Sequence, residues 1–274
     1  MNTEELRAEI RRLGPWHHDM QVAPGIRTGE VAKDVAYPPS FGRVTMVQPE
    51  RWIGRLIEEV FPDGLNGRSF LDCACNGGGY LLAAAERGAG RCFGLDVRDH
   101  WVDQARFVAR ETGARGVEFT TADLHTLPQM ELEPFDVTLF MGIFYHLPDP
   151  IASLRMVADH TKELLVLNTA YLPGGGDSLR LNLESETLVM SGVHRLAWLP
   201  TSELVLREIL HWCGFPHVRT TWRLPLPGGH FHRIELIAAR EASTFSRFDV
   251  LRPEALGPPR PGLLRRVLNR VRRR

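Results

Sequence analysis

The sequence contains almost no lysine: of its 33 basic residues only Lys33 and Lys162 are lysines, and the rest are arginines. It also lacks any apolar run near the roughly 18 residues that a membrane-spanning helix needs. The first residues, MNTEELRAEIRRLG, are charged and resemble a short helix rather than a signal peptide. These absences predict a cytoplasmic protein.

Cysteine is scarce as well, with four residues in the chain. Cys73 and Cys75 are separated by a single residue, which is the wrong spacing for a zinc-binding pair. Cys92 and Cys213 have no cysteine close to them in the sequence. We therefore expect four small, buried, reduced thiols and no metal site.

An excess of charge of one sign is missing too, because 33 basic residues balance 33 acidic ones. The exception is the segment 251–274, which has eight arginines and one glutamate. Within it, residues 263–274 place leucine and valine on one helical face and arginine on the other sides. Such a segment could contact an anionic membrane surface or, with less support, RNA phosphates, and it could also be a solvated terminus.

The chain is long enough, at 274 residues with 43% hydrophobic content, for one sizeable core with extensions. From Gly67 onward, short strand-like runs alternate with longer helical ones, which predicts a doubly wound, mostly parallel α/β sheet. A C-terminal hairpin contributes an antiparallel strand. We divide the chain into an N-terminal extension or lid (1–66), a main domain (67–240) with a substrate-side insertion (173–200), and a basic tail (241–274).

The apolar periodicity also places the individual elements. The strands are expected at 68–75, 91–97, 116–123, 135–147, 162–172, 217–226 and 231–240. The helices are expected at 48–61, 80–88, 99–113, 149–160 and 201–215.

The stretch FLDCACNGGGY, residues 70–80, follows the first predicted strand, at an edge of the sheet where ligands bind in this architecture. Its three glycines allow a tight turn and a close approach of backbone N–H groups to a ligand. A nicotinamide or flavin fingerprint would require glycine at position 82, where the chain has Leu82. A dinucleotide loop is therefore disfavoured.

Three carboxylates accompany successive strand ends. Asp72 lies just before the glycine turn, Asp96 ends the second strand and Asp123 ends the third. Asp96 can accept hydrogen bonds from both ribose hydroxyls, Asp123 from an adenine amino group, and Asp72 can receive an ammonium group. The set suits a ligand with ribose, adenine and an amino acid better than a pyrophosphate. The alternative is that Asp96 and Asp123 are helix caps.

The segments FLDCACNGGGY, GLDVRDHWVDQARFVA, TADLHTLP and FDVTLFMGIFYHLPDP together resemble a class I S-adenosylmethionine-dependent methyltransferase, which implies a Rossmann-like fold and S-adenosylmethionine as cofactor. The turn and MGIFYHL are more narrowly similar to a group that includes the bacterial tRNA wobble-uridine carboxymethyltransferase and methyltransferases of glycan and natural-product gene clusters. The resemblance covers residues 16–215. By position it implies these cofactor-binding residues: Asp72, Cys75, Asn76, Gly77, Gly78, Asp96, Val97, Asp123, Leu124, Met141 and Gly142.

Some positions depart from the pattern or extend it. Ala74 stands where the motif usually has glycine, and Gly79 where it often has an aromatic residue. Trp16 and His17, in the early segment PWHH, are expected to fold over the cofactor as part of a lid.

Methyl transfer from a sulfonium is an in-line displacement, so a base is needed only when the acceptor must lose a proton. His146, after the fourth strand, is the first candidate, with Tyr145 beside it and His194 in the insertion as a second; a structural role is the alternative for His146. Tyr145 and Arg233 could match residues that clamp a carboxylated cofactor in the wobble-uridine enzyme, although the lysines of that clamp are missing. Both are expected to contact substrate, and a surface position is the alternative for Arg233.

The sequence thus predicts a methyltransferase that acts on an oxygen or nitrogen of a small molecule or glycan. The alternatives are a tRNA wobble-uridine (carboxy)methyltransferase and a non-catalytic module that binds S-adenosylmethionine.

Overall fold

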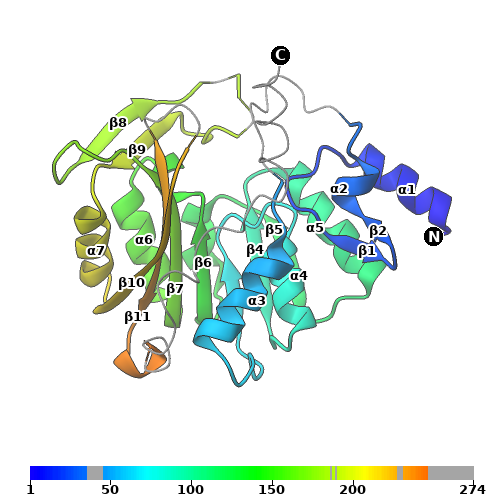
Figure 1. Ribbon diagram of the computed structural model, residues 1–274, viewed down its shortest axis with the longest axis horizontal. Coiled ribbons are helices and arrows are strands. Elements are labelled where there is room, and N and C mark those ends of the chain that lie inside the picture. Colours follow the sequence, from blue (N-terminus) through cyan, green and yellow to red (C-terminus); the bar gives the residue numbers. More distant parts are fainter. Residues whose placement is uncertain (36–45, 186, 189, 227–230, 246–274) are drawn as a thin grey trace, which may run out of the picture.

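A seven-stranded sheet forms the centre of the protein in the computed structural model, which describes residues 1–35, 46–185, 187–188, 190–226 and 231–245 (Figure 1). The strand order is β10–β11–β7–β6–β3–β4–β5. The strands are β3 (Phe70–Asp72), β4 (Cys92–Asp96), β5 (Val117–Thr121), β6 (Phe135–Met141), β7 (Thr161–Tyr171), β10 (His217–Pro225) and β11 (His232–Ala239).

The five strands from β3 to β7 are parallel, and β11 pairs antiparallel with both β7 and β10. The predicted doubly wound, mostly parallel sheet with an antiparallel C-terminal hairpin is therefore confirmed. From β3 the chain builds outward through β4 and β5, and then returns to place β6 on the other side of β3. The strand order reverses at this point, and the reversal opens a crevice at the carboxyl ends of the strands.

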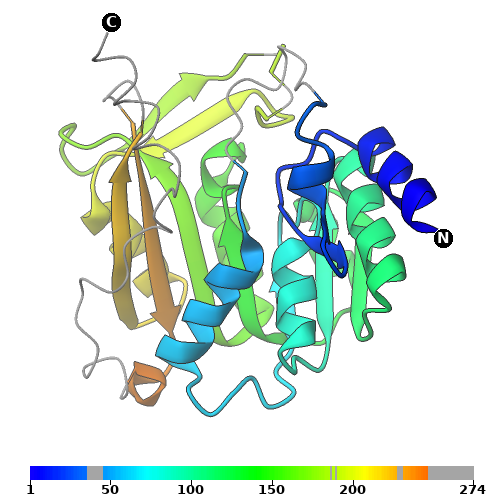
Figure 2. The same cartoon turned by 45° about the vertical axis from the view of Figure 1, so that its right-hand side comes forward.

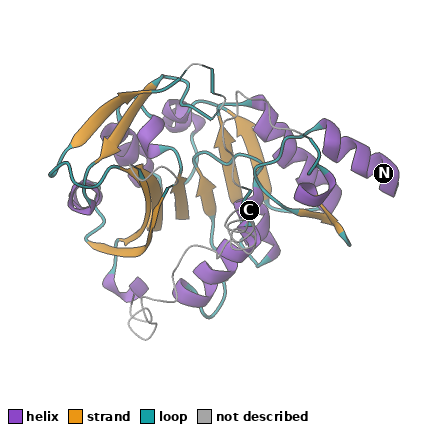
Figure 3. Cartoon of the chain, turned by 45° about the horizontal axis from the view of Figure 1, so that its top comes forward, coloured by secondary structure: helices purple, strands orange, loops and turns teal. Residues whose placement is uncertain are grey.

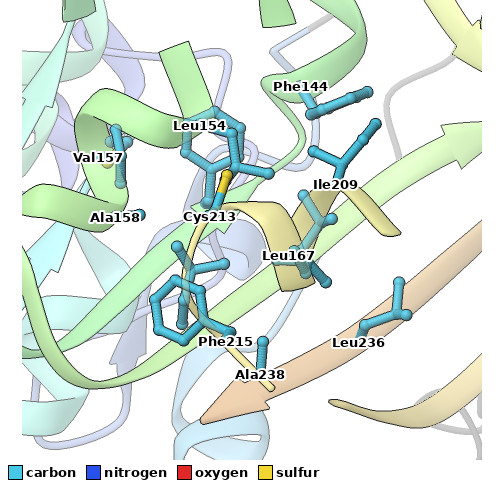
Figure 4. Packing of buried hydrophobic residues seen from close by; sticks show 14 of the residues in the cluster. Phe144, Leu154, Val157, Ala158, Leu167, Ile209, Cys213, Phe215, Leu236 and Ala238 are labelled. Carbon is cyan, nitrogen blue, oxygen red and sulfur yellow. The ribbon is translucent and has the colours of Figure 1, made fainter. Parts of the chain in front are cut away.

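Helices cover both faces of the sheet (Figures 1 and 2). Successive side chains of a strand point to opposite faces, so in β7 Val166 packs with one layer of helices and Leu167 with the other. Figure 4 shows the second layer, where Leu154 and Ile209 pack against Leu167 and Leu236. The first layer contains α3 (Pro49–Val60), α4 (Gly79–Glu86) and α5 (Asp99–Thr112), and the second contains α6 (Pro150–Asp159) and α7 (Glu203–Trp212).

The N-terminal segment packs on the outside of α5. It consists of α1 (Thr3–Arg12), β1 (Gln21–Ala23), β2 (Ile26–Arg27) and α2 (Thr28–Val31). Its apolar side chains form a cluster with Phe107 and Val108 of α5. Gln104 of α5 fixes the turn after α1, because its buried amide donates to the carbonyl oxygens of Leu13 (2.7 Å) and Pro15 (2.8 Å).

The insertion predicted at 173–200 contains a separate antiparallel hairpin of β8 (Leu179–Leu183) and β9 (Leu196–Pro200). The hairpin follows β7 and lies at the upper end of the sheet in Figures 1 to 3. Its backbone is joined to the end of β7 by a hydrogen bond from Leu172 N to Pro200 O (2.8 Å). This brings the segment between β8 and β9 to the carboxyl edge of the sheet.

The fourth predicted strand, 135–147, is shorter in the structure than expected. β6 ends at Met141 because Gly142 adopts a positive φ of 76°, and a 3₁₀ turn (η3, Phe144–His146) follows. The sequence remains apolar beyond the end of β6 because Phe144 and Leu147, in and after the 3₁₀ turn, are also buried, and this led to the longer prediction. Further 3₁₀ turns are η2 (Leu124–Met130) and η4 (Ala242–Phe245).

The predicted contact of residues 263–274 with a membrane surface or RNA lies outside the described residues. Within the part of the chain that the structure describes, no helix combines the length and the apolar character needed to cross a membrane. The cytoplasmic location and the division of the chain at residues 66 and 240 stay predictions.

Candidate functional site

The glycine turn, residues 73–79, connects β3 to α4 and is held tightly by its neighbours. Gly78 has a φ of 74°, and a Cβ at this position would lie 2.6 Å from the Phe119 ring and 2.7 Å from the Ala105 methyl group. At Gly79 a Cβ would lie 2.5 Å from the Pro49 ring, and the Gly79 N–H donates to Nδ1 of His18 (3.1 Å). Both positions therefore need glycine, and the second explains why no aromatic residue stands there.

Asp72 and Asp96 end the adjacent strands β3 and β4 and are 1% and 7% exposed. Burial, with a contribution from Asp96, raises the pKa of Asp72 to about 7. Burial also raises the pKa of Asp96, although that carboxylate accepts the backbone N–H groups of Asn76 (3.0 Å) and Arg98 (3.1 Å). Oδ2 of Asp72 has no hydrogen-bond partner among the described residues, and a buried oxygen of this kind suits a ligand that donates to it.

Asp123 sits at the end of the third strand and also caps η2, since Oδ1 accepts the His125 N–H (2.9 Å). The same oxygen contacts Nδ1 of His125 (2.8 Å), whose Nε2 meets Asp149 (2.9 Å). Burial acts against both shifts, but these contacts lower the pKa of Asp123 and raise that of His125. The helix-cap alternative therefore describes Asp123 in part, whereas the residue at the N-cap of α5 is Arg98 and not Asp96.

His194 reaches the same place from the insertion, with Nε2 3.5 Å from Oδ2 of Asp123. The ligand atoms of Asp123, His125 and His194 all lie within 4.8 Å of one another, so the group could hold a metal ion. Two histidines and one carboxylate are a common set for first-row transition metals. The hydrogen bonds and ion pairs described above also account for the cluster as a charged network, and the expectation of no metal stays a prediction.

One cavity of about 590 Å³ connects these groups at the carboxyl edge of the sheet. Most of the predicted site residues line it: His17, Asp72, Asn76, Asp96, Val97, Asp123, Leu124, Met141, Gly142, Tyr145, His146, His194 and Arg233.

Four predicted residues lie behind the lining instead. Trp16 packs in the N-terminal cluster, where its indole N–H donates to Ile10 O (2.7 Å). Cys75 is buried in the sheet core, and Gly77 and Gly78 belong to the turn beneath the cavity wall. These four residues support the wall and do not form its surface.

Tyr145 and His146 stand at the η3 end of the cavity, with ring centroids 3.9 Å apart. Nδ1 of His146 lies 2.8 Å from Oε2 of Glu184, a residue that follows β8 in the insertion. His146 therefore follows β6 and lines the same cavity as Met141 and Gly142, and its role as the base stays a prediction.

Arg233 faces the cavity and not the outer surface, so the surface alternative is wrong. Its guanidinium donates to Oδ1 of Asn168 from Nε (3.0 Å) and Nη2 (2.8 Å), and from Nη1 to the Tyr145 hydroxyl (3.4 Å). Burial, with a contribution from Arg233, lowers the pKa of His17 to about 4. The neutral His17 ring has an Nδ1 that finds no partner in the described part of the chain.

Sequence reasoning missed the residues that support this end of the cavity. Glu235 is 3% exposed and accepts hydrogen bonds from Trp52 Nε1 (3.0 Å), Asn168 Nδ2 (3.0 Å) and Thr221 Oγ1 (2.8 Å). Asn168 and Glu235 each follow or precede a run of apolar residues in their strands, in LLVLN and ELIAA. A polar residue within a mostly apolar strand was the available signal, since it must find partners inside the protein.

Comparison with known sequences gives a consistent result. A family profile described as "Methyltransferase domain" matches residues 65–205. The chain is 32% identical over 146 residues to a ubiquinone biosynthesis O-methyltransferase of Idiomarina loihiensis, covering 52% of this chain and 55% of that protein. It is 27% identical over 168 residues to a tRNA U34 carboxymethyltransferase of Aeromonas salmonicida, covering 60% and 49%. The match therefore spans about half the length of these curated relatives.

Solved structures share the fold. The N-terminal domain of EvdMO1 with S-adenosylhomocysteine bound is similar with a TM-score of 0.70 and 22% identity, covering 88% of this chain and 98% of that one. A 1,6-didemethyltoxoflavin-N1-methyltransferase from Burkholderia thailandensis gives a TM-score of 0.51 at 20% identity, covering 70% and 77%. The chain belongs to the methyltransferase domain family, and its identification as a class I S-adenosylmethionine-dependent methyltransferase is confirmed.

Proposed function

We propose that this chain transfers the methyl group of S-adenosylmethionine to an oxygen or nitrogen of a small molecule or glycan. The observation that carries the proposal is one cavity with carboxylates along one wall and a histidine beside the expected methyl position. Asp72, Asp96 and Asp123 provide the carboxylates, and His146 stands at the η3 end next to Gly142.

The charges of the wall complement this cofactor. We expect Asp96 to accept hydrogen bonds from the ribose hydroxyls. The buried Oδ2 of Asp72, which has no hydrogen-bond partner among the described residues, would accept from the ammonium group. Asp123 lies one strand further along, where the adenine amino group would reach it. Two buried carboxylates attract the cationic methionine end and would repel a pyrophosphate, since Coulomb forces are strong where water is excluded.

The part of the cavity where we expect the methyl acceptor contains the imidazole of His146 and the aromatic side chains of Trp52 and Trp222. An uncharged hydroxyl must lose its proton as the methyl group arrives, and a histidine is the side chain best suited to take that proton near neutral pH. His146 is placed for this role, while Trp52 and Trp222 line the cavity and offer flat apolar surfaces to a ring-shaped acceptor. A hydroxyl acceptor agrees with the O-methyltransferase name of one relative.

A second candidate is modification of a tRNA wobble uridine with a carboxylated cofactor. It is favoured by the contact of Arg233 with Tyr145 inside the cavity and by the name of another relative. The scarcity of lysine stands against it, because only Lys33 precedes the main domain.

A transfer assay separates the candidates. The purified chain is incubated with a small-molecule extract and S-adenosylmethionine labelled in its methyl group and, in parallel, with total tRNA and either the same cofactor or its carboxylated form. We expect label in the small-molecule fraction, and less of it with Asp96→Ala at a cofactor concentration near the wild-type Kd. Modified wobble uridine in the tRNA arm would replace the proposal with the second candidate. Tight binding of S-adenosylmethionine in calorimetry without transfer to either fraction would identify a binding module.

A further inference from the structure

We infer that Glu184, supplied by the insertion, is a positioning residue that orients His146 for proton transfer. This inference rests on the proposed function, because it assigns a role within the same methyl transfer. Oε2 of Glu184 lies 2.8 Å from Nδ1 of His146, and the two side chains are 13% and 17% exposed. The contact joins η3 to the β8–β9 hairpin across 38 residues of sequence.

The carboxylate of Glu184 is itself held in place. Its Oε2 accepts the backbone N–H of Gly192 (2.7 Å), and its own backbone N–H donates to Arg195 O (2.9 Å). These bonds anchor Glu184, which follows β8, to the connecting loop and to the residue before β9. A carboxylate fixed in this way presents one defined acceptor to the imidazole and does not follow it through several rotamers.

Gly192 lets the loop between β8 and β9 approach His146 closely. A Cβ at position 192 would lie 2.7 Å from His146 O, 2.8 Å from its Cβ and 2.9 Å from Oε2 of Glu184. The same loop is fastened on the adenosine side, where Nη2 of Arg98 donates to Ser191 O (2.5 Å). The loop is therefore held both by Arg98 and by the pair of His146 and Glu184, and all three residues belong to or support the cavity lining.

The chemistry follows from the donor and acceptor properties of the pair. An ionised carboxylate only accepts hydrogen bonds, so it selects the imidazole form with the proton on Nδ1 and leaves the lone pair on Nε2. No hydrogen bond of Nε2 occurs among the described residues, and His146 lines the cavity. As the acceptor oxygen bonds to the methyl carbon and the carbon–sulfur bond breaks, the hydroxyl proton passes to Nε2. The products are the methyl ether, S-adenosylhomocysteine and an imidazolium paired with Glu184.

Nitrogen-15 NMR of the histidine rings tests the inference without knowledge of the acceptor. The full chain is labelled at histidine and saturated with S-adenosylhomocysteine at mildly alkaline pH, and His146→Ala assigns the signal. We expect wild-type His146 to carry its proton on Nδ1. In Glu184→Gln the amide can donate to Nδ1, so the proton should move to Nε2 or the ring should sample both forms.

Turnover in the transfer assay provides the second measurement. Glu184→Gln should lower kcat by about 10–100-fold, which is less than the roughly 10²–10⁴-fold that a general base contributes in total because His146 is still present, and leave KM for S-adenosylmethionine within about twofold. Asp177→Asn is the control, since it makes the same chemical change elsewhere in the insertion, where Asp177 accepts from Ser202 Oγ (2.6 Å). Gly192→Ala should impair turnover in the same direction by pushing the pair apart.

Each outcome separates the inference from the proposed function. An unchanged His146 ring form in Glu184→Gln overturns the inference, whatever the activity. A changed ring form without methyl transfer by the wild-type chain upholds the orienting contact and rejects the proposed reaction. If Glu184→Gln unfolds at a lower temperature than Asp177→Asn, Gly192→Ala decides instead, and a normal kcat in that variant counts against the inference.

Discussion

Asp96, at the end of β4, accepts the backbone N–H of Asn76 in the glycine turn at 3.0 Å. This bond joins the turn under the expected methionine end to the carboxylate expected to hold the ribose. The hydrogen bond therefore links the positions of the glycine turn and of Asp96, although 20 residues separate Asn76 from Asp96 in the sequence. Loss of Asp96 should disturb both.

Replacement of Asp96 by alanine removes the proposed ribose acceptor and leaves the Asn76 N–H without its partner. We expect the Kd for S-adenosylhomocysteine in isothermal titration calorimetry to rise by about 10–100-fold, which corresponds to one hydrogen bond to a charged group. Asp103→Asn, at an exposed position of α5, is the control and should change the Kd by less than about twofold. Equal affinity of Asp96→Ala and wild type would remove Asp96 from the cofactor site.

The raised pKa of Asp72 predicts a pH-dependent penalty in the cofactor-free protein. Below about pH 4 the carboxyl is protonated in both the folded and unfolded states. Between that pH and the folded-state pKa of about 7, the unfolded chain releases the proton and the folded chain retains it, so the folded state loses stability as pH rises. Asp72→Asn removes this loss, and its Tm should exceed that of wild type by an amount that grows up to about pH 7 and then levels off.

Asp136→Asn is the matched control with the opposite sign. Hydrogen bonds from Ser69 N (2.7 Å) and Oγ (2.8 Å) outweigh burial and lower the pKa of Asp136. Its ionised form stabilises the folded state above its unfolded-state pKa, and this contribution is lost as pH falls through the folded-state value. Differential scanning fluorimetry across this range should show Asp136→Asn below wild type at neutral pH. A constant Tm difference for Asp72→Asn would contradict the burial argument.

Gly78→Ala tests how closely the turn is packed. The new Cβ would meet the Phe119 ring and the Ala105 methyl group at less than 3 Å, in addition to the strain of a positive φ. Gly88→Ala is the control, because Gly88 also has a positive φ (90°) but a Cβ there meets nothing within 4 Å. Urea unfolding should show a loss of about 1–2 kcal/mol for the control and about 1–3 kcal/mol more for Gly78→Ala. Equal losses would mean that backbone conformation alone requires the glycine.

His146→Ala should lower turnover in the transfer assay by about 10²–10⁴-fold and leave the Kd for S-adenosylhomocysteine within about twofold, because we propose that the ring acts on the acceptor and is not needed to hold the cofactor. His160→Ala serves as the control, since its ring bonds to Met156 O (2.9 Å) at the end of α6. Full activity of His146→Ala would rule out its role as the base, and methylation of an acceptor that needs no deprotonation would then be favoured.

The sheet and much of the cofactor wall could be predicted from local patterns in the sequence. The hydrophobic periods of strands and helices are local properties of the sequence. Because the carboxyl ends of parallel strands lie at one edge of the sheet, Asp72, Asp96 and Asp123 could be expected to lie near one another. The fourth strand was predicted too long, because the apolar sequence pattern continues to the buried residue Phe144. The same pattern does not reveal that the backbone at Gly142 is left-handed and ends the strand.

Long-range contacts required the tertiary structure. Glu184 lies in a polar part of the insertion, and nothing in the local sequence distinguishes it from a surface carboxylate until the hairpin brings it against His146. The sequence likewise left a surface position open for Arg233, and only the pairing of β11 with β7 shows that its guanidinium donates to Asn168. Trp16 was predicted to fold over the cofactor, but in the structure its side chain packs in the N-terminal apolar cluster.

The sequence by itself therefore determined the fold class and the carboxylates that line one wall of the cavity, because hydrophobic periodicity and strand ends follow from neighbouring residues. Only the tertiary structure decided which side chains complete the acceptor end. Hydrogen bonds between segments far apart in the chain depend on how the insertion lies against the end of β7 and how the C-terminal hairpin pairs with β7, and neither arrangement has a local signature in the sequence.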